Sequence, residues 1–379
     1  MVRGIGINME SVRSSNVGAV LSYLNTYGAS SRKKIAEDLK LTTATLSIIT
    51  NDLIKEGLLV ELGEVTENKV GRKKILIDIN KISRFSLGIE IQKRKIIFII
   101  TDLKANIIFE KEWSRKENFN IDDFNKILKF IEKKIEPIKT KILGVGILVQ
   151  GKIEQNIAID SPIPNILDIT EKKLNLKCVL ENNMKGLVLT EMYFKENYKN
   201  FWVLKYGPGV GTSVVLNGQL IQGAKNKPIE FGHAPILGKN SNNYCSICKK
   251  YGCVESEIHF DIIVKKLENI GYKKKRNETD LNFIKRCINL DEENLNIIDT
   301  SLEILADYLI LSSWIISVDE LILCGGFFSE KKFFNLFKKK LKNKNININF
   351  NNIFYMDNYS YKRKIAGAIL IIEQFFNNY

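Results

Sequence analysis

Half of the cysteines in this chain and one of its histidines lie in one short stretch. The sequence of 379 residues has 6 cysteines and 2 histidines, and it places His233, Cys245, Cys248 and Cys253 close together. Three thiolates and one imidazole form a complete tetrahedral donor set for a structural zinc ion, Zn2+, which would brace the loop and leave no open position for chemistry. The alternative is that the cysteines pack as small hydrophobic residues beside a hydrogen-bonded histidine. The Cys-x-x-Cys pair with a third cysteine and a nearby histidine favours zinc.

The residues around these ligands resemble the signature of the ROK family, which comprises repressors, open reading frames and sugar kinases. The match is Glu-x-Gly-His, a cysteine cluster and Gly-Cys-x-Glu, formed by Glu230, Gly232, His233, Cys248, Gly252, Cys253 and Glu255. In that family the His and three Cys bind zinc, while the two Glu and the His hold sugar hydroxyls. The resemblance therefore implies that Glu230, His233 and Glu255 bind a sugar. The chain departs from the signature at Cys245, which lies three residues before Cys248 instead of two, and a lysine follows Cys248 where the family has glycine.

Two further positions bear on whether the chain is a sugar kinase. The kinases of the family resemble this chain over residues 180–184, but they carry an Asp that takes the proton of the attacking sugar hydroxyl where this chain has Asn183. A carboxamide can hydrogen-bond a hydroxyl but cannot act as this general base. The kinases also need a glycine-rich hairpin for the ATP phosphates, and residues 91–94 contain no glycine. The resemblance thus implies that Asn182 and Asn183 hold sugar hydroxyls in a site that binds without turnover.

A second glycine-rich run, residues 207–211, resembles the family's other phosphate loop, and residues 321–326 resemble its adenosine-contacting strand and glycine pair. Glycines at this spacing also serve in a tight hairpin. A phosphate nest needs more than glycines, so we interpret both segments as retained scaffold.

The first 80 residues have the pattern of a small DNA-binding domain. Apolar residues recur at helical spacing over 14–27, Ser31 can cap a second helix, and a third helix is expected from a turn at 41–43 to Glu56. Two strands, 58–61 and 75–78, flank a charged loop that ends in Gly-Arg-Lys-Lys. A helix-turn-helix followed by a basic hairpin predicts a winged helix-turn-helix.

The polar side of the third helix and the tip of this hairpin are the candidate DNA contacts. Short hydroxyl and amide side chains reach base edges in a major groove, and basic side chains meet phosphates. The alternative is a helical packing module, which needs no basic tip. The order of elements also resembles the N-terminal domain of ROK repressors. The candidates are Thr42, Thr43, Thr45, Ser47, Thr50, Asn51, Arg72, Lys73 and Lys74.

The remaining residues read as a two-lobed α/β domain. Residues 81–197 show a β-β-β-α-β order that matches the ribonuclease-H-like half of actin-type sugar kinases. We expect residues 198–360 to form a second lobe with the zinc loop, and a C-terminal helix over 361–379 to pack back on the first lobe, as in the family. The predicted fold is therefore a winged helix-turn-helix at 1–80 followed by a two-lobed ROK domain.

Composition limits the class of protein. A hydrophobic content of 45% is ordinary for a globular chain. The sequence has no apolar run of membrane-spanning length and no signal-peptide core, and its other cysteines are scattered, so we expect a soluble, cytoplasmic protein with reduced thiols. The net charge of +14 is compatible with nucleic-acid binding, but most of the excess lies outside the first 80 residues and does not locate a DNA site.

These observations predict a sugar-responsive transcriptional repressor of carbohydrate metabolism that performs no phosphoryl transfer. Its expected partners are double-stranded operator DNA, a small sugar such as xylose, glucose or N-acetylglucosamine, and further copies of itself, because two winged helices reading a two-fold operator require at least a homodimer. One alternative is an ATP-dependent sugar kinase, similar to a glucokinase or N-acetylglucosamine kinase, with an attached DNA-binding domain. Another is an adaptor whose zinc loop docks a sugar-transport component.

Overall fold

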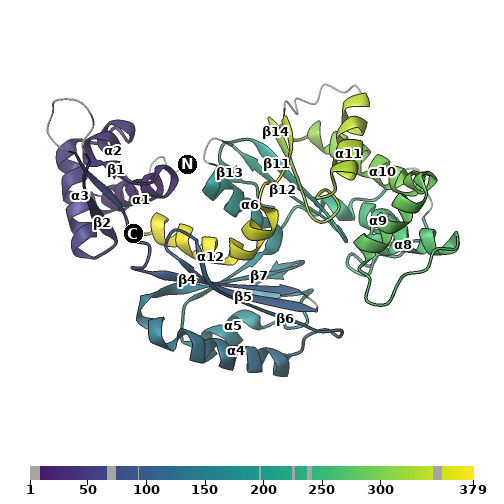
Figure 1. Cartoon of the computed structure of the whole chain (residues 1–379), viewed down its shortest axis with the longest axis horizontal. Coiled ribbons are helices and arrows are strands. Elements are labelled where there is room, and N and C mark those ends of the chain that lie inside the picture. The colour runs from purple at the N-terminus through teal and green to yellow at the C-terminus, as the bar shows by residue number, and fades with distance from the viewer. Residues whose placement is uncertain are drawn as a thin grey trace, which may run out of the picture. The chain divides into compact units, whose positions relative to one another are not determined.

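Two compact units make up the computed structural model of the chain, which describes residues 9–65, 74–92, 94–195, 198–223, 227–236, 241–344 and 352–379. The first unit comprises residues 1–196 and 361–379, and the second comprises residues 197–360. Each unit has its own five-stranded sheet (Figure 1). None of the helices within the described ranges is long and apolar enough to cross a membrane.

The first unit begins with three helices and a small antiparallel sheet of order β1-β3-β2. Side-chain caps start two of the helices. Ser31 Oγ accepts from Lys34 N at 3.3 Å, as the sequence predicts, and Thr42 Oγ1 accepts from Thr45 N at 3.1 Å. The elements are α1 (Met9–Tyr27), β1 (Ser30–Ser31), α2 (Arg32–Asp38), α3 (Thr43–Lys55), β2 (Leu59–Val65) and β3 (Lys74–Ile79).

A second sheet, of order β10-β7-β4-β5-β6, follows in the same unit. Strands β10, β7 and β4 are parallel, whereas β5 and β6 run antiparallel to their neighbours. Helices α4 and α5 cover one face and the C-terminal helix α12 lies on the other (Figure 1). The predicted β-β-β-α-β order is present. The elements are β4 (Phe85–Gln92), β5 (Lys95–Asp102), β6 (Ile107–Ser114), α4 (Ile121–Ile135), η1 (Glu136–Lys141), β7 (Ile142–Val149), β8 (Ile153–Glu154), β9 (Ile157–Ala158), α5 (Ile166–Leu174), β10 (Cys178–Asn182), α6 (Asn183–Phe194) and α12 (Tyr359–Asn377).

Glycines let α12 approach its neighbours at backbone distance. A Cβ atom added to Gly146 on β7 would lie 1.8 Å from the carbonyl oxygen of Gly367 on α12. A Cβ atom on Gly18 of α1 would lie 2.4 Å from the carbonyl oxygen of Phe376, at the other end of α12. Backbone atoms cannot rotate away as a side-chain end can, so α12 touches both the sheet and α1 only because these positions carry no side chain.

The N-terminal elements therefore share one hydrophobic core with α12 and part of the second sheet. An ion pair adds to this core, since Lys104 Nζ lies 2.7 Å from Asp78 Oδ1 and joins the turn after β5 to β3. The buried members of the shared core include Val17, Val20, Leu21, Leu24, Leu46, Ile49, Leu53, Ile97, Ile99, Tyr193, Ile369, Ile372 and Phe376.

The second unit is built on a sheet of order β13-β12-β11-β14-β15, covered by helices that enclose a separate core. Strands β11, β14 and β15 are parallel, and β12 and β13 are antiparallel to their neighbours. The elements are β11 (Phe201–Tyr206), β12 (Val210–Leu216), β13 (Gln219–Leu220), η3 (Phe231–His233), α7 (Val254–Ile258), α8 (Phe260–Asn269), α9 (Asp280–Leu290), η4 (Glu292–Asn294), α10 (Leu295–Ser313), β14 (Glu320–Cys324), α11 (Lys331–Asn343) and β15 (Asn352–Tyr355).

The close approach of β7 and α12 makes Gly146→Ala destabilising. We expect the substitution to lower the free energy of unfolding by about 1–3 kcal/mol or more, because overpacked backbone must move apart. The measurement is urea unfolding followed by circular dichroism. Gly326→Ala is the control, since its Cβ atom would first meet Leu281 Cδ2 at 3.0 Å, the movable end of a side chain. Equal losses in the two variants would contradict the proposed role of the glycine contact.

Candidate functional site

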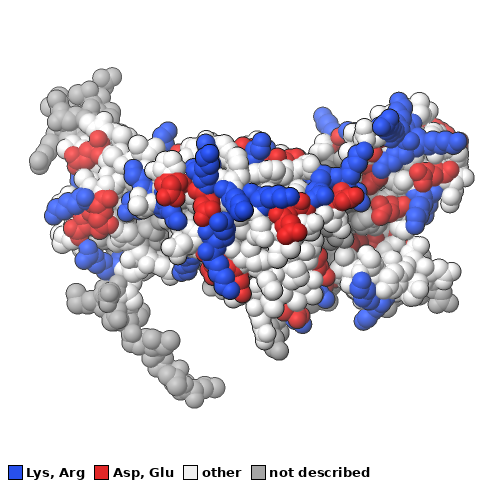
Figure 2. Space-filling view, turned by 90° about the horizontal axis from the view of Figure 1, so that it is seen from below, with Lys and Arg blue, Asp and Glu red and all other residues white. Residues whose placement is uncertain are grey.

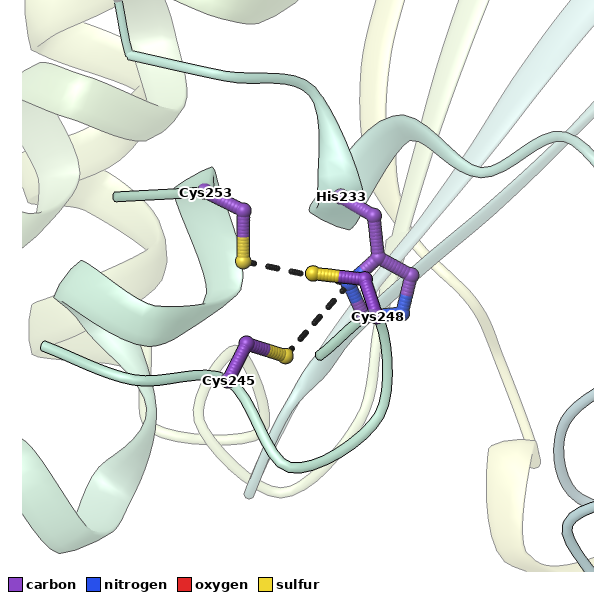
Figure 3. Close-up of side chains that lie close together, drawn as sticks. All are labelled: His233, Cys245, Cys248 and Cys253. Atoms are coloured by element: carbon purple, nitrogen blue, oxygen red, sulfur yellow. Dashed lines mark hydrogen bonds between the residues drawn. The ribbon is translucent and has the colours of Figure 1, made fainter. Parts of the chain in front are cut away.

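The four predicted metal ligands come together in the second unit (Figure 3). One donor atom from each of His233, Cys245, Cys248 and Cys253 lies within 4.8 Å of the others. His233 Nδ1 is 3.8 Å from Cys245 Sγ and 3.9 Å from Cys253 Sγ. Tetrahedral zinc with its usual bond lengths sets donor atoms about 3.6–3.8 Å apart, so these two separations suit a metal ion of this size. The one-residue change in spacing before Cys248 does not prevent Cys245 from joining the cluster.

Short turns position these side chains. Cys245 N donates to Lys250 O at 2.9 Å, and Lys249 N donates to Cys245 O at 3.0 Å, which closes a tight loop around Cys248. Lys249 has a φ of +60°, a left-handed conformation in which glycine is less strained than other residues. That conformation explains why a glycine suits this position. Cys253 then caps α7, with its Sγ accepting from Ser256 N at 3.4 Å.

Burial makes the Cys253 thiol depend on a cation. Burial, together with the nearby Cys245 sulfur, raises the pKa of Cys253 to about 12. Without a positive charge in the cluster, Cys253 stays a protonated thiol at neutral pH. A divalent ion would supply that charge and hold the ligands as thiolates, releasing protons as it binds.

His233 faces two different groups with its two ring nitrogens. Nδ1 points to the cysteine sulfurs, and Nε2 lies 3.7 Å from Glu230 Oε2. If Nδ1 ligates a metal, the ring proton resides on Nε2 and is directed towards the side of Glu230. One imidazole can therefore serve both roles predicted for it, as a metal ligand and as a hydrogen-bond donor to a bound hydroxyl.

Glu255 connects the segment that carries the candidate metal ligands His233 to Cys253, called the metal loop below, to the glycine-rich run after β11. Its Oε2 accepts from Val210 N at 3.0 Å, and a Cβ atom on Gly209 would lie 2.7 Å from the same oxygen. Gly209 thus makes room for a carboxylate. The N–H group of Val210 is already used, and the negative charge of Glu255 opposes a phosphate at this place. Gly325 has a packing role as well, because its Cβ atom would lie 2.5 Å from the carbonyl oxygen of Tyr206.

The two asparagines at the start of α6, in the first unit, differ in their surroundings. Asn182 is buried and caps the helix, its Oδ1 accepting from Met184 N at 2.8 Å while its Nδ2 donates to Gly151 O at 2.8 Å. These bonds give Asn182 a structural task beside the sugar contact that the family resemblance implies. Asn183 is partly exposed, and within the described ranges its carboxamide has no hydrogen-bond partner. Of the two side chains, Asn183 is the one with donors and acceptors available to a ligand.

Helix α3 carries most of the candidate DNA contacts, and the structure corrects one of them. Thr42, Thr43 and Asn51 are exposed, while Thr45 and Ser47 are half-buried. Thr50 is completely buried, because it lies one helical turn after the core residue Leu46 and its hydroxyl donates to that residue's carbonyl at 2.9 Å. Thr50 therefore cannot reach a duplex. Arg72 and Lys73 lie outside the described residues, as does the side chain of Lys74.

The sequence analysis missed Arg32, the first residue of α2. Its Nε donates to Thr50 Oγ1 at 2.9 Å, and its Nη2 donates to Asn51 Oδ1 at 3.3 Å and to Glu61 Oε1 at 2.9 Å. One guanidinium thus joins α2, α3 and β2. Only its residue type, a planar fork of donors suited to phosphate, was a signal in the sequence. Figure 2 shows the other Lys and Arg side chains of the face displayed spread out among Asp and Glu, so charge alone marks no DNA site there.

Residues 86–374 match the ROK family. The chain is 31% identical to the xylose repressor of Caldicellulosiruptor bescii over 260 residues, which cover 64% of this chain and 63% of that protein. It is 22% identical to the DNA-binding transcriptional dual regulator NagC of Escherichia coli over 263 residues, 66% of this chain and 63% of that protein. The matched part spans less than two thirds of both relatives.

Solved structures share the fold. A ROK family transcriptional regulator, a homologue of the Escherichia coli MLC protein, superimposes with a TM-score of 0.78 at 17% identity over 97% of both chains. A ROK hexokinase from Thermus thermophilus superimposes with a TM-score of 0.60 at 15% identity, over 75% of this chain and 97% of that one. By the extent of the sequence match, which includes the metal loop, the chain belongs to the ROK family.

Proposed function

We propose that this protein is a sugar-responsive, DNA-binding transcriptional repressor of carbohydrate-metabolism genes. The observation that carries the proposal is the exposure of Thr43 and Asn51 on α3, which would be the second helix of a helix-turn-helix, on a chain whose residues 86–374 match the ROK family. The names of two relatives, a xylose repressor and the regulator NagC, agree with it.

In this proposal residues 1–80 form a winged helix-turn-helix. Helices α2 and α3 are joined by a short turn, and β2 and β3 pair antiparallel as the wing. The capped N-terminus of α3 and the exposed Thr43 and Asn51 would face the major groove. Arg32 lies beside Asn51 and would contact a phosphate or orient the Asn51 carboxamide. The hairpin tip with Arg72 and Lys73 remains a predicted phosphate contact.

The kinase-like domain would bind sugar without phosphorylating it. Asn183 cannot serve as the base that deprotonates a sugar hydroxyl. Strands β4 and β5 pair as far as Gln92 and Lys95, and the sequence of this hairpin contains none of the glycines that let backbone N–H groups approach phosphates. In the other glycine run, Glu255 occupies the backbone donor of Val210. The general base, the first phosphate hairpin and the second glycine-rich run, which phosphoryl transfer requires, are therefore all altered.

Hydroxyl-bearing ligands suit the groups that remain. Carboxylates of Glu230 and Glu255 accept hydrogen bonds, protonated His233 Nε2 donates, and the Asn183 carboxamide does both. Zinc bound by His233, Cys245, Cys248 and Cys253 would hold in place the segment of the second unit that carries Glu230, His233 and Glu255. The sugar would then act through its different affinity for the two DNA-binding states. A homodimer would present two winged helices to a two-fold operator.

We expect one zinc ion per chain when the protein is purified without chelators. Cys253→Ala should lose the metal and melt at a lower temperature, because the remaining ligands leave the tetrahedral set incomplete. The measurement is plasma mass spectrometry together with thermal unfolding. Cys324→Ala, a buried cysteine elsewhere in the second unit, should retain the metal. A metal-free wild type, or equal metal loss in both variants, would contradict the assignment.

A second prediction concerns DNA. We expect the wild type to select a two-fold symmetric sequence from a random pool of duplexes, and Asn51→Ala to bind that duplex about 5- to 150-fold more weakly, the cost of a lost base contact. Binding is measured by fluorescence anisotropy at fixed salt. Asn269→Ala makes the same chemical change on the exposed end of α8 and should bind normally. Failure to select any duplex would remove the repressor proposal.

A third prediction separates binding from turnover. With ATP, Mg2+ and D-xylose, D-glucose or N-acetyl-D-glucosamine, the protein should form no ADP above background, yet one of these sugars should raise its melting temperature by mass action. Glu255→Gln should reduce that rise, whereas Glu268→Gln on the exposed surface of α8 should not. Asn183→Asp alone should stay inactive, because the phosphate loops are still missing. Sustained turnover by the wild type would favour a sugar kinase.

A further inference from the structure

Helix α6 connects Asn183, the proposed sugar contact, with α1 of the proposed DNA-binding segment. It begins at Asn183 and runs for 12 residues, a length of about 18 Å. Near its other end, the hydroxyl of Tyr193 donates to Asn25 Oδ1 of α1 at 2.7 Å. Both ends of this helix and all of α1 belong to the first unit.

The body of α6 is held as a rigid element. Met184, Leu187 and Val188 are buried, and Gly186 lets the helix lie against Leu148 of β7, whose Cδ2 would be 2.7 Å from a Cβ atom at that glycine. A tightly packed interior transmits small displacements instead of absorbing them. A shift imposed at the first turn of α6 therefore reaches its last turn.

The last turn of α6 is fastened by polar contacts. Glu191 is fully buried, and its Oε2 accepts from Lys362 Nζ of α12 at 2.6 Å, while its Oε1 lies 3.3 Å from Lys195 Nζ. Removing one partner of such a buried pair would leave the other charge uncompensated, so the pair is expected to stay together. When α6 moves, the contacts on α12 and α1 must move with it or break.

On the other side of the contact, α1 is tied to both helices of the helix-turn-helix. Tyr23 donates to Asp38 Oδ2 of α2 at 2.6 Å, and Arg13 donates to Asp52 Oδ2 of α3 at 2.7 Å. Asp52 directly follows Asn51, the candidate base contact. A change in the position of α1 is thus passed on to the helix that would enter the major groove.

We propose that the Tyr193–Asn25 hydrogen bond couples sugar binding at Asn183 to the DNA affinity of α3, making Tyr193 and Asn25 positioning residues. The inference rests on the proposed function. A hydrogen bond of this length is lost when its atoms separate by about 1 Å, so it depends on the position of the last turn of α6 relative to α1. Burial raises the pKa of Tyr193 well above its usual range, so the phenol remains a donor at physiological pH.

The test compares DNA affinity with and without sugar in full-length variants. The duplex is the one that the wild type selects, the sugars are D-xylose, D-glucose and N-acetyl-D-glucosamine, and binding is followed by fluorescence anisotropy. We expect a wild-type change in Kd of about 5- to 150-fold with the active sugar. Tyr193→Phe and Asn25→Ala should each reduce that ratio by about 2- to 12-fold, and the double variant should be no worse than either single variant, because one bond is lost in all three. Sugar binding itself, measured by melting shift, should be unchanged.

Two controls distinguish this bond from general docking. Tyr27→Phe removes a hydroxyl from the exposed end of α1 and should keep the full response. Lys104→Met breaks the ion pair with Asp78, which joins the same two parts of the unit without involving α6, and should lower stability but keep the response.

Each outcome is decisive. A Tyr193→Phe variant whose affinities with and without sugar change by the same factor would mean that the bond is merely structural and would overturn the proposal, as would an equal loss of response in Lys104→Met. A wild type that binds neither a duplex nor any of the sugars would refute the proposed function, and the coupling would fail with it. A normal wild-type response that persists in Tyr193→Phe would refute the coupling alone.

Discussion

Backbone contact between α12 and its neighbours is the constraint on which the first unit depends. Gly146 and Gly367 bring the centre of the helix onto the sheet, and Gly18 brings α1 onto the end of the same helix. At such distances a helix cannot rotate or slide without moving the surfaces on both sides. Ser86 reinforces the contact by donating to Ala368 O at 2.8 Å inside the interface. These contacts therefore hold the sheet, the C-terminal helix and the N-terminal elements together as one packed body.

In the second unit, the described residues between 230 and 253 mostly follow turns and short bridges instead of long strands. Ligand bonds can replace a hydrophobic core in such a segment. Cys253 starts α7, so a metal ion bound there would also fix Glu255 two residues later, and Glu255 in turn reaches the N–H group of Val210. The glycine run after β11 gains a purpose that needs no nucleotide: it leaves space for this carboxylate. The metal loop, the Glu255 carboxylate and the glycine-rich turn after β11 therefore contact one another in turn, although they lie far apart in the sequence.

Local features of the sequence predicted much of the fold and of the candidate site. Ser31 caps a helix where its type predicts, and the cluster of candidate metal ligands follows from four donor residues that lie close together in the sequence. Tertiary packing decided the rest. Thr50 has the same residue type as the exposed Thr43, but its spacing from Leu46 places it in the core. Arg32 is noteworthy only after α2, α3 and β2 have been assembled around it. The shared core of the N-terminal segment depends on glycines at positions 18, 146 and 367, and no short-range pattern relates them.

In the proposed function, the paired asparagines at the start of α6 replace a catalytic position by a binding position. Asn182 uses both ends of its carboxamide to hold the helix and the loop at Gly151, so the backbone there is fixed by the protein itself. Asn183 can then exchange a carboxylate for a carboxamide of the same shape without disturbing the helix. The exchange removes a proton acceptor and retains hydrogen bonding. Affinity for a hydroxyl would survive this change while acceleration of phosphoryl transfer would not, because binding needs only the hydrogen bonds and the reaction also needs a base. In the same direction, the negative charges of Glu230 and Glu255 oppose an anionic group beside them, which agrees with the proposal of a neutral, hydroxyl-rich ligand.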